Sequence, residues 1–112
     1  PFIPTKGDWW VAFKGKEAVA FAGIRPASSV PFGGYLCRAG VLPGYRGQGL
    51  QQRLIRKRVA FARARGWKTV VSDTNLNPAS SNALIACGFR MFKPEVPWSF
   101  ATACYWRKTI DQ

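Results

Sequence analysis

The sequence feature that most constrains the fold is a glycine-rich turn, Arg46-Gly47-Gln48-Gly49, between a predicted strand and a predicted helix. The strand spans Tyr35 to Val41 and is closed by Pro43-Gly44. From Leu50 to Arg65 there is no Gly or Pro, and strong helix formers dominate. A helix that starts at such a turn presents unpaired N–H groups and the positive end of its dipole. The segment therefore predicts a site for phosphate or pyrophosphate.

The rest of the chain alternates strand-like and helix-like segments. Asn77-Pro78 predicts the start of a second helix, because Asn caps free N–H groups and Pro suits the first helical position. We expect this helix to run from Pro78 to about Ala86. The predicted strands are Trp9–Phe13, Ala18–Ile24, Tyr35–Val41, Trp67–Ser72, Phe89–Phe92 and Trp98–Lys108. The order β-β-β-α-β-α-β-β predicts one α/β (α+β) domain over residues 1–112, with a mixed, mostly antiparallel sheet and helices on its faces.

The first predicted helix is amphipathic, with two exceptions to the pattern. At 100° per residue its apolar side chains fall within one half-circle. The basic side chains that gather on the other side are Arg53, Arg56, Lys57 and Arg63. Arg58 and Arg65 fall inside the apolar arc, so the amphipathicity is imperfect.

The charge of the chain is strongly positive. Seventeen Lys and Arg against five Asp and Glu give a net charge of +12. Such a field attracts the phosphates of a cofactor, nucleic acid such as RNA, or acidic protein surfaces. A basic surface that only keeps the domain soluble is the alternative.

Composition also excludes several classes of site. There is no histidine, which excludes Ser-His and Cys-His catalytic pairs, and we expect no metal site. The three cysteines form no Cys-x-x-Cys pair, so we expect no disulfide framework and a reducing, cytoplasmic location. No apolar run approaches the ~20 residues of a membrane helix, so no membrane partner is expected.

Two familiar phosphate-binding motifs fail at the glycine turn. A P-loop ends in Gly-Lys-Ser/Thr, whereas Gly49 is followed by Leu50-Gln51. A dinucleotide fingerprint needs a third glycine, and Gln52 stands there. A plain strand-to-helix turn remains the alternative to a ligand site.

The segment Val41 to Leu50 resembles the acetyl-CoA-binding motif of the GNAT (Gcn5-related N-acetyltransferase) family, Arg/Gln-x-x-Gly-x-Gly/Ala. Arg46 and Gly49 match this motif, and Gln51 stands where its last small residue is usual. Asn77-Pro78-Ala79-Ser80, followed by Cys87-Gly88-Phe89, resembles a second segment of the same family. The resemblance covers about Asp8 to Lys108.

The resemblance implies an acetyl-CoA site and an N-acetyltransferase activity. In this family two central strands splay apart, the pantetheine arm lies between them, and an amine attacks the thioester directly. The residues that the resemblance assigns to the cofactor are Ala39, Gly40, Val41, Arg46, Gly47, Gln48, Gly49, Leu50, Gln51, Asn77 and Ser80. Helix capping is the alternative role for Asn77. The acceptor amine is not identified, and a module that binds CoA or nucleic acid without turnover is the alternative function.

The sequence departs from the family at the expected acid and base. Leu84 stands where many members have a tyrosine acid, and Ser72 stands where some have a carboxylate base. Asp73 is the best candidate for a catalytic base, although a shift of one residue along a strand faces the other side. Its alternative role is to cap the turn before Asn77. The phenols of Tyr35, Tyr45 and Tyr105 have no predicted position.

A second departure is the length before the first hairpin. The family usually has a strand and two helices there, and only seven residues precede Asp8. Either those elements belong to a missing upstream segment, or the chain is a compact form whose acceptor site is open or completed by a second copy in a homodimer.

Overall fold

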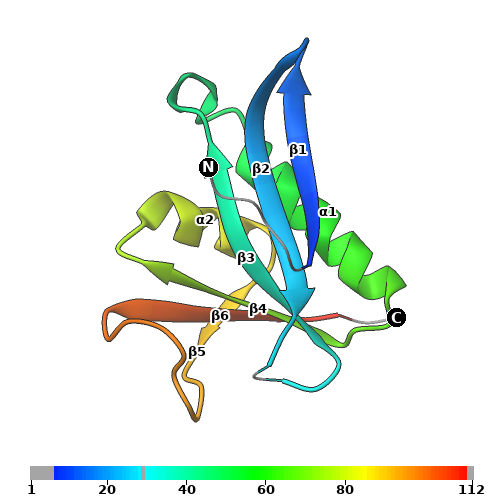
Figure 1. Ribbon diagram of the computed structural model, residues 1–112. Helices are drawn as coiled ribbons and strands as arrows, with labels where there is room; N and C mark the ends of the chain where they lie inside the picture. The colour runs from blue at the N-terminus through cyan, green and yellow to red at the C-terminus, as the bar shows by residue number, and fades with distance from the viewer. Residues whose placement is uncertain (1–6, 29, 111–112) are drawn as a thin grey trace.

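The computed structural model describes residues 7–28 and 30–110, and its elements follow the predicted order (Figure 1). The strands are β1 (Asp8–Lys14), β2 (Glu17–Pro26), β3 (Gly33–Val41), β4 (Thr69–Asn75), β5 (Arg90–Phe92) and β6 (Ala103–Thr109). The helices are the short 3₁₀ turn η1 (Pro43–Tyr45), α1 (Leu50–Ala64) and α2 (Pro78–Ala86). Within the described ranges the strands form one sheet in the order β1-β2-β3-β4-β6-β5, in which only β3 and β4 are parallel. The predicted mixed, mostly antiparallel α/β fold is confirmed.

Two predicted strands differ from the structure by more than two residues at one end. The last strand begins at Ala103 and not at Trp98, because the Trp98 ring lies in the preceding connection and packs edge-on against Tyr105. The strand predicted at Trp67–Ser72 is shifted toward the C-terminus and reaches Asn75, where it still pairs with Ala103. Pairing with β6 therefore extends β4 beyond the segment that the sequence predicted as a strand.

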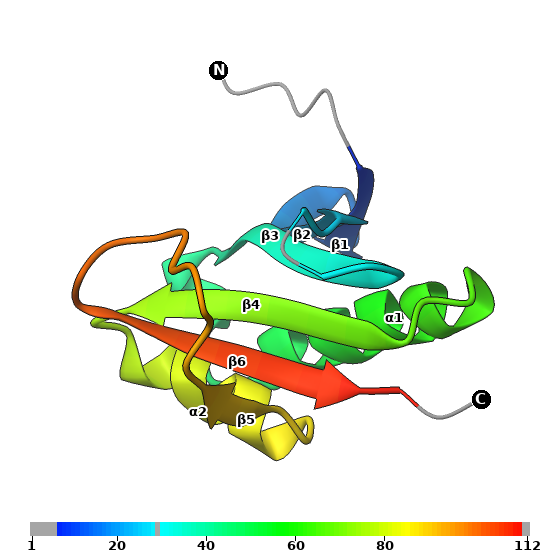
Figure 2. The ribbon, with the colours of Figure 1, turned by 90° about the horizontal axis from the view of Figure 1, so that it is seen from below.

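Both helices lie on the same face of the sheet, as Figure 2 shows. Their apolar side chains share one core with the sheet, which includes Ile24, Ile55, Val70 and Leu84. Burying a side chain of this size stabilises the fold by about 1.5–3 kcal/mol. The connection 93–102 rises on the opposite face, over β4 and β6 (Figure 2). Among the described residues, no helix combines the length and apolar character needed to span a membrane.

The two parallel strands separate in the middle of the sheet. Their pairing runs from Gly33↔Thr69 to Tyr35↔Val71 and stops there, although both strands continue. A bulge follows in β3, since Cys37 and Arg38 together oppose Gly23 of β2. A bulge bends its strand and increases the twist, so β3 turns away from β4. The opening between the separated strands is where the candidate site lies.

Candidate functional site

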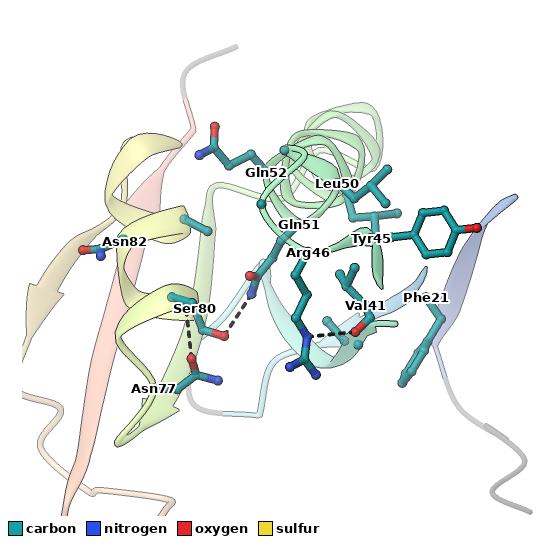
Figure 3. Close-up of a pocket in the computed structure, with 17 residues that line it drawn as sticks. Phe21, Val41, Tyr45, Arg46, Leu50, Gln51, Gln52, Asn77, Ser80 and Asn82 are labelled. Carbon is teal, nitrogen blue, oxygen red and sulfur yellow. Dashed lines mark hydrogen bonds between the residues drawn. The ribbon is translucent and has the colours of Figure 1, made fainter. Parts of the chain in front are cut away.

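A cavity of about 430 Å³ opens between the end of β3 and the first turns of α1 and α2 (Figure 3). It is lined by all the residues that the sequence assigned to the cofactor except Gln48, which is exposed and does not line it. The predicted residues that the structure brings together are Ala39, Gly40, Val41, Arg46, Gly47, Gly49, Leu50, Gln51, Asn77 and Ser80. We call this the outer cavity.

The glycine turn has the backbone conformation that its sequence predicts. Gly47 and Gly49 have φ angles of 78° and 77°, in the left-handed region that side chains disfavour. A Cβ at either position would meet nothing within 4 Å, so the turn needs glycine for its conformation and leaves open space in front of it. Gly49 is the N-cap of α1, and the helix start has no side-chain cap and no acidic residue in its first turn. The end of α1 is therefore available to an anion.

Arg46 adds a cation inside the outer cavity. Its Nε donates to the Val41 carbonyl over 3.1 Å, which lays the guanidinium across the space between the glycine turn and the end of β3 (Figure 3). The sequence assigned Arg46 to the cofactor, and the structure places this residue on the wall of the outer cavity. No acidic residue lines this cavity, so the positive charge of Arg46 is not neutralised by its wall and suits a polyphosphate.

Gln51, Ser80 and Asn77 form a hydrogen-bonded series that joins the two helices (Figure 3). Gln51 Nε2 donates to Ser80 Oγ over 2.9 Å, and the Ser80 amide donates to Asn77 Oδ1 over 3.1 Å. Asn77 thus caps α2, which confirms the capping role, and it lines the outer cavity at the same time. The long side chain of Gln51 reaches α2, where the usual small residue could not.

A second space, the inner cavity, continues from the outer cavity into the opening between β3 and β4. Its volume is about 300 Å³, and it shares Ala39, Gln51, Asn77 and Ser80 with the outer cavity. Leu84 lines it from α2 and is only 4% exposed. The helix therefore presents an aliphatic side chain at the position where the resemblance implies a tyrosine in many members.

Ser72 and Asp73 lie beside the inner cavity on β4. Ser72 is buried, and its Oγ donates to the Leu36 carbonyl over 3.3 Å, across the point where the strands separate. Asp73 is half-buried and pairs with Tyr105 inside the sheet. Since Asp73 lies within β4, its alternative role as a cap for the turn before Asn77 is wrong.

Asp73 lines two spaces that lie on either side of the sheet. One is the inner cavity, and the other is a cavity of about 580 Å³ on the face away from the helices, which we call the opposite cavity. Asp73 Oδ2 accepts hydrogen bonds from the Tyr35 hydroxyl over 3.1 Å and from Trp98 Nε1 over 2.6 Å. Burial and, after it, the Asp73 carboxylate raise the pKa of Tyr35 to about 12. The carboxylate is therefore held by two donors at the junction of the two spaces.

The other two phenols lie elsewhere. The Tyr45 hydroxyl donates to Glu17 on the surface over 2.9 Å, and this bond raises the pKa of Tyr45. The buried Tyr105 hydroxyl accepts from the Ser99 amide over 2.9 Å. Neither lines the inner cavity.

Sequence reasoning missed one wall of the outer cavity. Phe21 lines it from β2, and a Cβ at its cross-strand partner Gly40 would come within 2.7 Å of the Phe21 ring. A glycine opposite a large aromatic residue in an antiparallel pair is the signal that could have identified this contact.

Comparison with known proteins identifies the family. Residues 2–89 match the model of the Acetyltransferase (GNAT) family. The chain belongs to this family. Among GNAT relatives, N-acetyltransferase 8F1 of Rattus norvegicus is 30% identical over 93 residues, which cover 80% of this chain and 42% of the relative. The chain spans less than half the length of the curated relatives that it matches.

Solved structures confirm the GNAT fold at low sequence identity. The IAA acetyltransferase from Bacillus cereus matches with a TM-score of 0.78 and 18% identity, over 94% of this chain and 79% of that one. A putative streptothricin acetyltransferase from Bacillus anthracis, in complex with acetyl coenzyme A, has a TM-score of 0.78 and 20% identity. This match covers 96% of the present GNAT chain and 65% of the other.

Proposed function

We propose that this GNAT domain transfers an acetyl group from acetyl-CoA to an amine by direct attack of the amine on the thioester. The observation that carries the proposal is the position of Asp73, at the junction of the inner and opposite cavities. A donor molecule can enter from the helix side, and an amine can reach the same carboxylate from the other face. One opening between two strands thus serves two substrates.

The donor set of the outer cavity fits acetyl-CoA. The glycine turn and the uncapped start of α1 would hold the pyrophosphate, with Arg46 supplying positive charge. Asn77 and Ser80 would contact the middle of the cofactor, and the backbone of Ala39, Gly40 and Val41 would bond its arm. The solved complex of a similar fold with acetyl coenzyme A supports this assignment.

Asp73 is the proposed base. A lysine-like amine has a pKa of ~10.4, so nearly all of it is protonated at neutral pH and must lose a proton to react. Asp73 would take this proton directly or through one water molecule. Tyr35 and Trp98 fix the carboxylate by donating to the same oxygen. Backbone N–H groups near Val41, on the edge of β3 that β4 leaves, would hold the developing oxyanion.

The proposal also includes a macromolecule that carries the acceptor amine. RNA is the acidic macromolecule that we propose as a carrier of the acceptor, because Arg53, Arg56, Lys57 and Arg63 are all exposed along α1. A homodimer that completes the acceptor side and a cytoplasmic location remain predictions. The names of the curated relatives favour turnover over a module that only binds CoA or nucleic acid.

Thermal unfolding with and without acetyl-CoA tests the proposed donor. A ligand that binds only the folded state should stabilise it by ~2.7 kcal/mol at a hundredfold excess over its dissociation constant. Release of the CoA thiol in the presence of a panel of amines then tests transfer. Absence of stabilisation by both CoA and acetyl-CoA would contradict the proposed function.

A further inference from the structure

Arg58 is a buried cation in the middle of α1. Its side chain is 2% exposed and faces the sheet, inside the apolar arc of the helix. Nε donates to the Leu54 carbonyl over 3.1 Å, and Nη1 donates to the Gly23 carbonyl over 3.0 Å. Gly23 is the residue opposite the bulge in β3, so Arg58 supplies a donor where the strand pairing is interrupted. The hydrogen bonds explain how a guanidinium is held at this position.

The charge of Arg58 has no acidic partner among the described residues. Both of its hydrogen bonds go to backbone carbonyls. Burial lowers the pKa of Arg58 to about 10, so the guanidinium stays charged at neutral pH. A buried charge without a counterion is costly, and neutral carbonyls compensate it only in part. Such a group favours any anion that forms beside it.

Arg58 lines the inner cavity, where an anion must form if the proposed reaction takes place there. With the phosphates at the glycine turn and the amine at Asp73, the thioester lies between them in this cavity. The other ionisable groups that line it are Tyr35, Cys37, Arg38 and Asp73. The Tyr35 pKa of about 12 makes this phenol a poor acid for a thiolate. The wall of the cavity therefore offers two guanidinium cations, those of Arg38 and Arg58, and no phenol that readily donates a proton.

We propose that the Arg58 guanidinium stabilises the thiolate of coenzyme A as it leaves, from the wall of the inner cavity. The inference rests on the proposed acetyl transfer. In this step the amine nitrogen forms a bond to the carbonyl carbon, and the carbon–sulfur bond breaks with its electron pair remaining on sulfur. The proton of the amine goes to Asp73 or to water. Arg58 keeps its protons, and the thiolate is protonated by solvent after release.

The direct test is the pKa of the coenzyme A thiol when it is bound to the protein. The ultraviolet absorbance of the thiolate is measured against pH, and the complex with desulfo-CoA is subtracted to remove the protein's own cysteines and tyrosines. An opposite charge at ~4–6 Å lowers the pKa of an acidic group by about 1 to 3. We expect the bound thiol to have a pKa lower by this amount than the free coenzyme.

Three variants separate the charge of Arg58 from its structural role. Arg58→Gln removes the charge and keeps an N–H donor for a carbonyl, and it should return the pKa of the bound thiol to that of free coenzyme A. Arg58→Lys should retain most of the lowering. Arg56→Gln removes the same charge from an exposed position of α1 and should match the parent. Adenosine bisphosphate, which carries phosphates and no thiol, should bind all four proteins equally.

The results that overturn the inference are equally specific. A parent protein that binds coenzyme A with an unshifted thiol pKa overturns it without any variant, which covers the case in which Arg58→Gln does not fold. A lowered pKa that persists in a folded Arg58→Gln variant overturns it as well. Failure of the parent to bind either coenzyme A or adenosine bisphosphate would instead overturn the proposed function.

Discussion

Tyr35 and Asp73 meet at the point where the two parallel strands part: the Tyr35 hydroxyl donates to Asp73 Oδ2 over 3.1 Å. Tyr35 belongs to the last pair of the β3–β4 ladder, and Asp73 lies two residues beyond its partner Val71. Trp98 donates to the same oxygen from the connection on the opposite face. The carboxylate is thus fixed by one donor from β3 and one donor from the connection between β5 and β6. This arrangement makes Asp73 the first residue to test.

Replacing Asp73 with Asn should reduce turnover and leave the binding of acetyl-CoA intact. The amide cannot accept a proton, and positioned bases contribute about 10²–10⁴-fold to such rates. Asp73 does not line the outer cavity, so the dissociation constant of acetyl-CoA should stay close to that of the parent. Release of the CoA thiol measures turnover, and calorimetry measures the dissociation constant of acetyl-CoA.

Ser72→Ala is the matched control for this prediction. Ser72 is adjacent on β4, lines the inner cavity and donates to the Leu36 carbonyl, so it is close to the site without being a base. Its removal should have a much smaller effect on turnover. Equal rates for Asp73→Asn and the parent would remove Asp73 from the mechanism.

The Tyr35 phenol predicts a pH dependence of stability above pH 10. Its pKa is about 12 in the folded protein and ~10 in an unfolded chain. Between these two pH values the folded state binds more protons than the unfolded state. The contribution of the neutral Tyr35 phenol to the free energy of unfolding is therefore complete below pH 10 and is lost as the pH rises through 12. The urea midpoint of unfolding should therefore fall by a larger amount between pH 9 and pH 11 in the parent than in the Tyr35→Phe variant. The lysines titrate in both proteins, so an identical fall in the two would contradict the prediction.

The parts of the fold that depend on local chemistry could be predicted from the sequence. Asn77-Pro78 starts α2, and Gly66, with a φ of 79°, follows the end of α1, because caps and left-handed glycines act within one turn of chain. The left-handed conformation of Gly47 and Gly49 in the glycine turn is predictable for the same reason, and the anion site there stays a prediction. These signals involve residues that are neighbours in the sequence.

The parts that depend on distant contacts could not be predicted. Trp98 lies outside β6, and its indole donates to Asp73, 25 residues away, a contact that no local pattern indicates. The side chain of Arg58 looked like an exception within an apolar arc, and only its contact with Gly23 explains it. No periodic pattern reports which distant carbonyl a buried guanidinium contacts.

Gly49→Asp should abolish most of the binding of acetyl-CoA. The substitution forces a side chain into the left-handed region at a φ of 77° and places a negative charge at the start of α1. Gly44→Asp adds the same charge to the same connection, at an exposed position that does not line the outer cavity. Calorimetry should show binding lost in the first variant and retained in the second. Unchanged affinity in a folded Gly49→Asp variant would contradict the assignment of this turn.

The exposed basic side of α1 predicts binding of RNA that depends on salt. Arg53 lies near the start of the helix, and Arg63 lies about 15 Å farther along its axis at ~1.5 Å per residue, too far for the phosphates of the same cofactor. Contacts with RNA phosphates make log affinity fall with log salt by ~0.7 to 0.9 per contact. Replacing Arg56 and Arg63 with Gln should flatten that slope and leave the affinity for acetyl-CoA nearly unchanged, because neither residue lines the outer cavity. A generic RNA titrated across a salt series measures the slope. Absence of RNA binding at low salt, or a slope that the two substitutions do not alter, would leave the charge of α1 as a means of solubility and the acceptor as a small molecule or peptide.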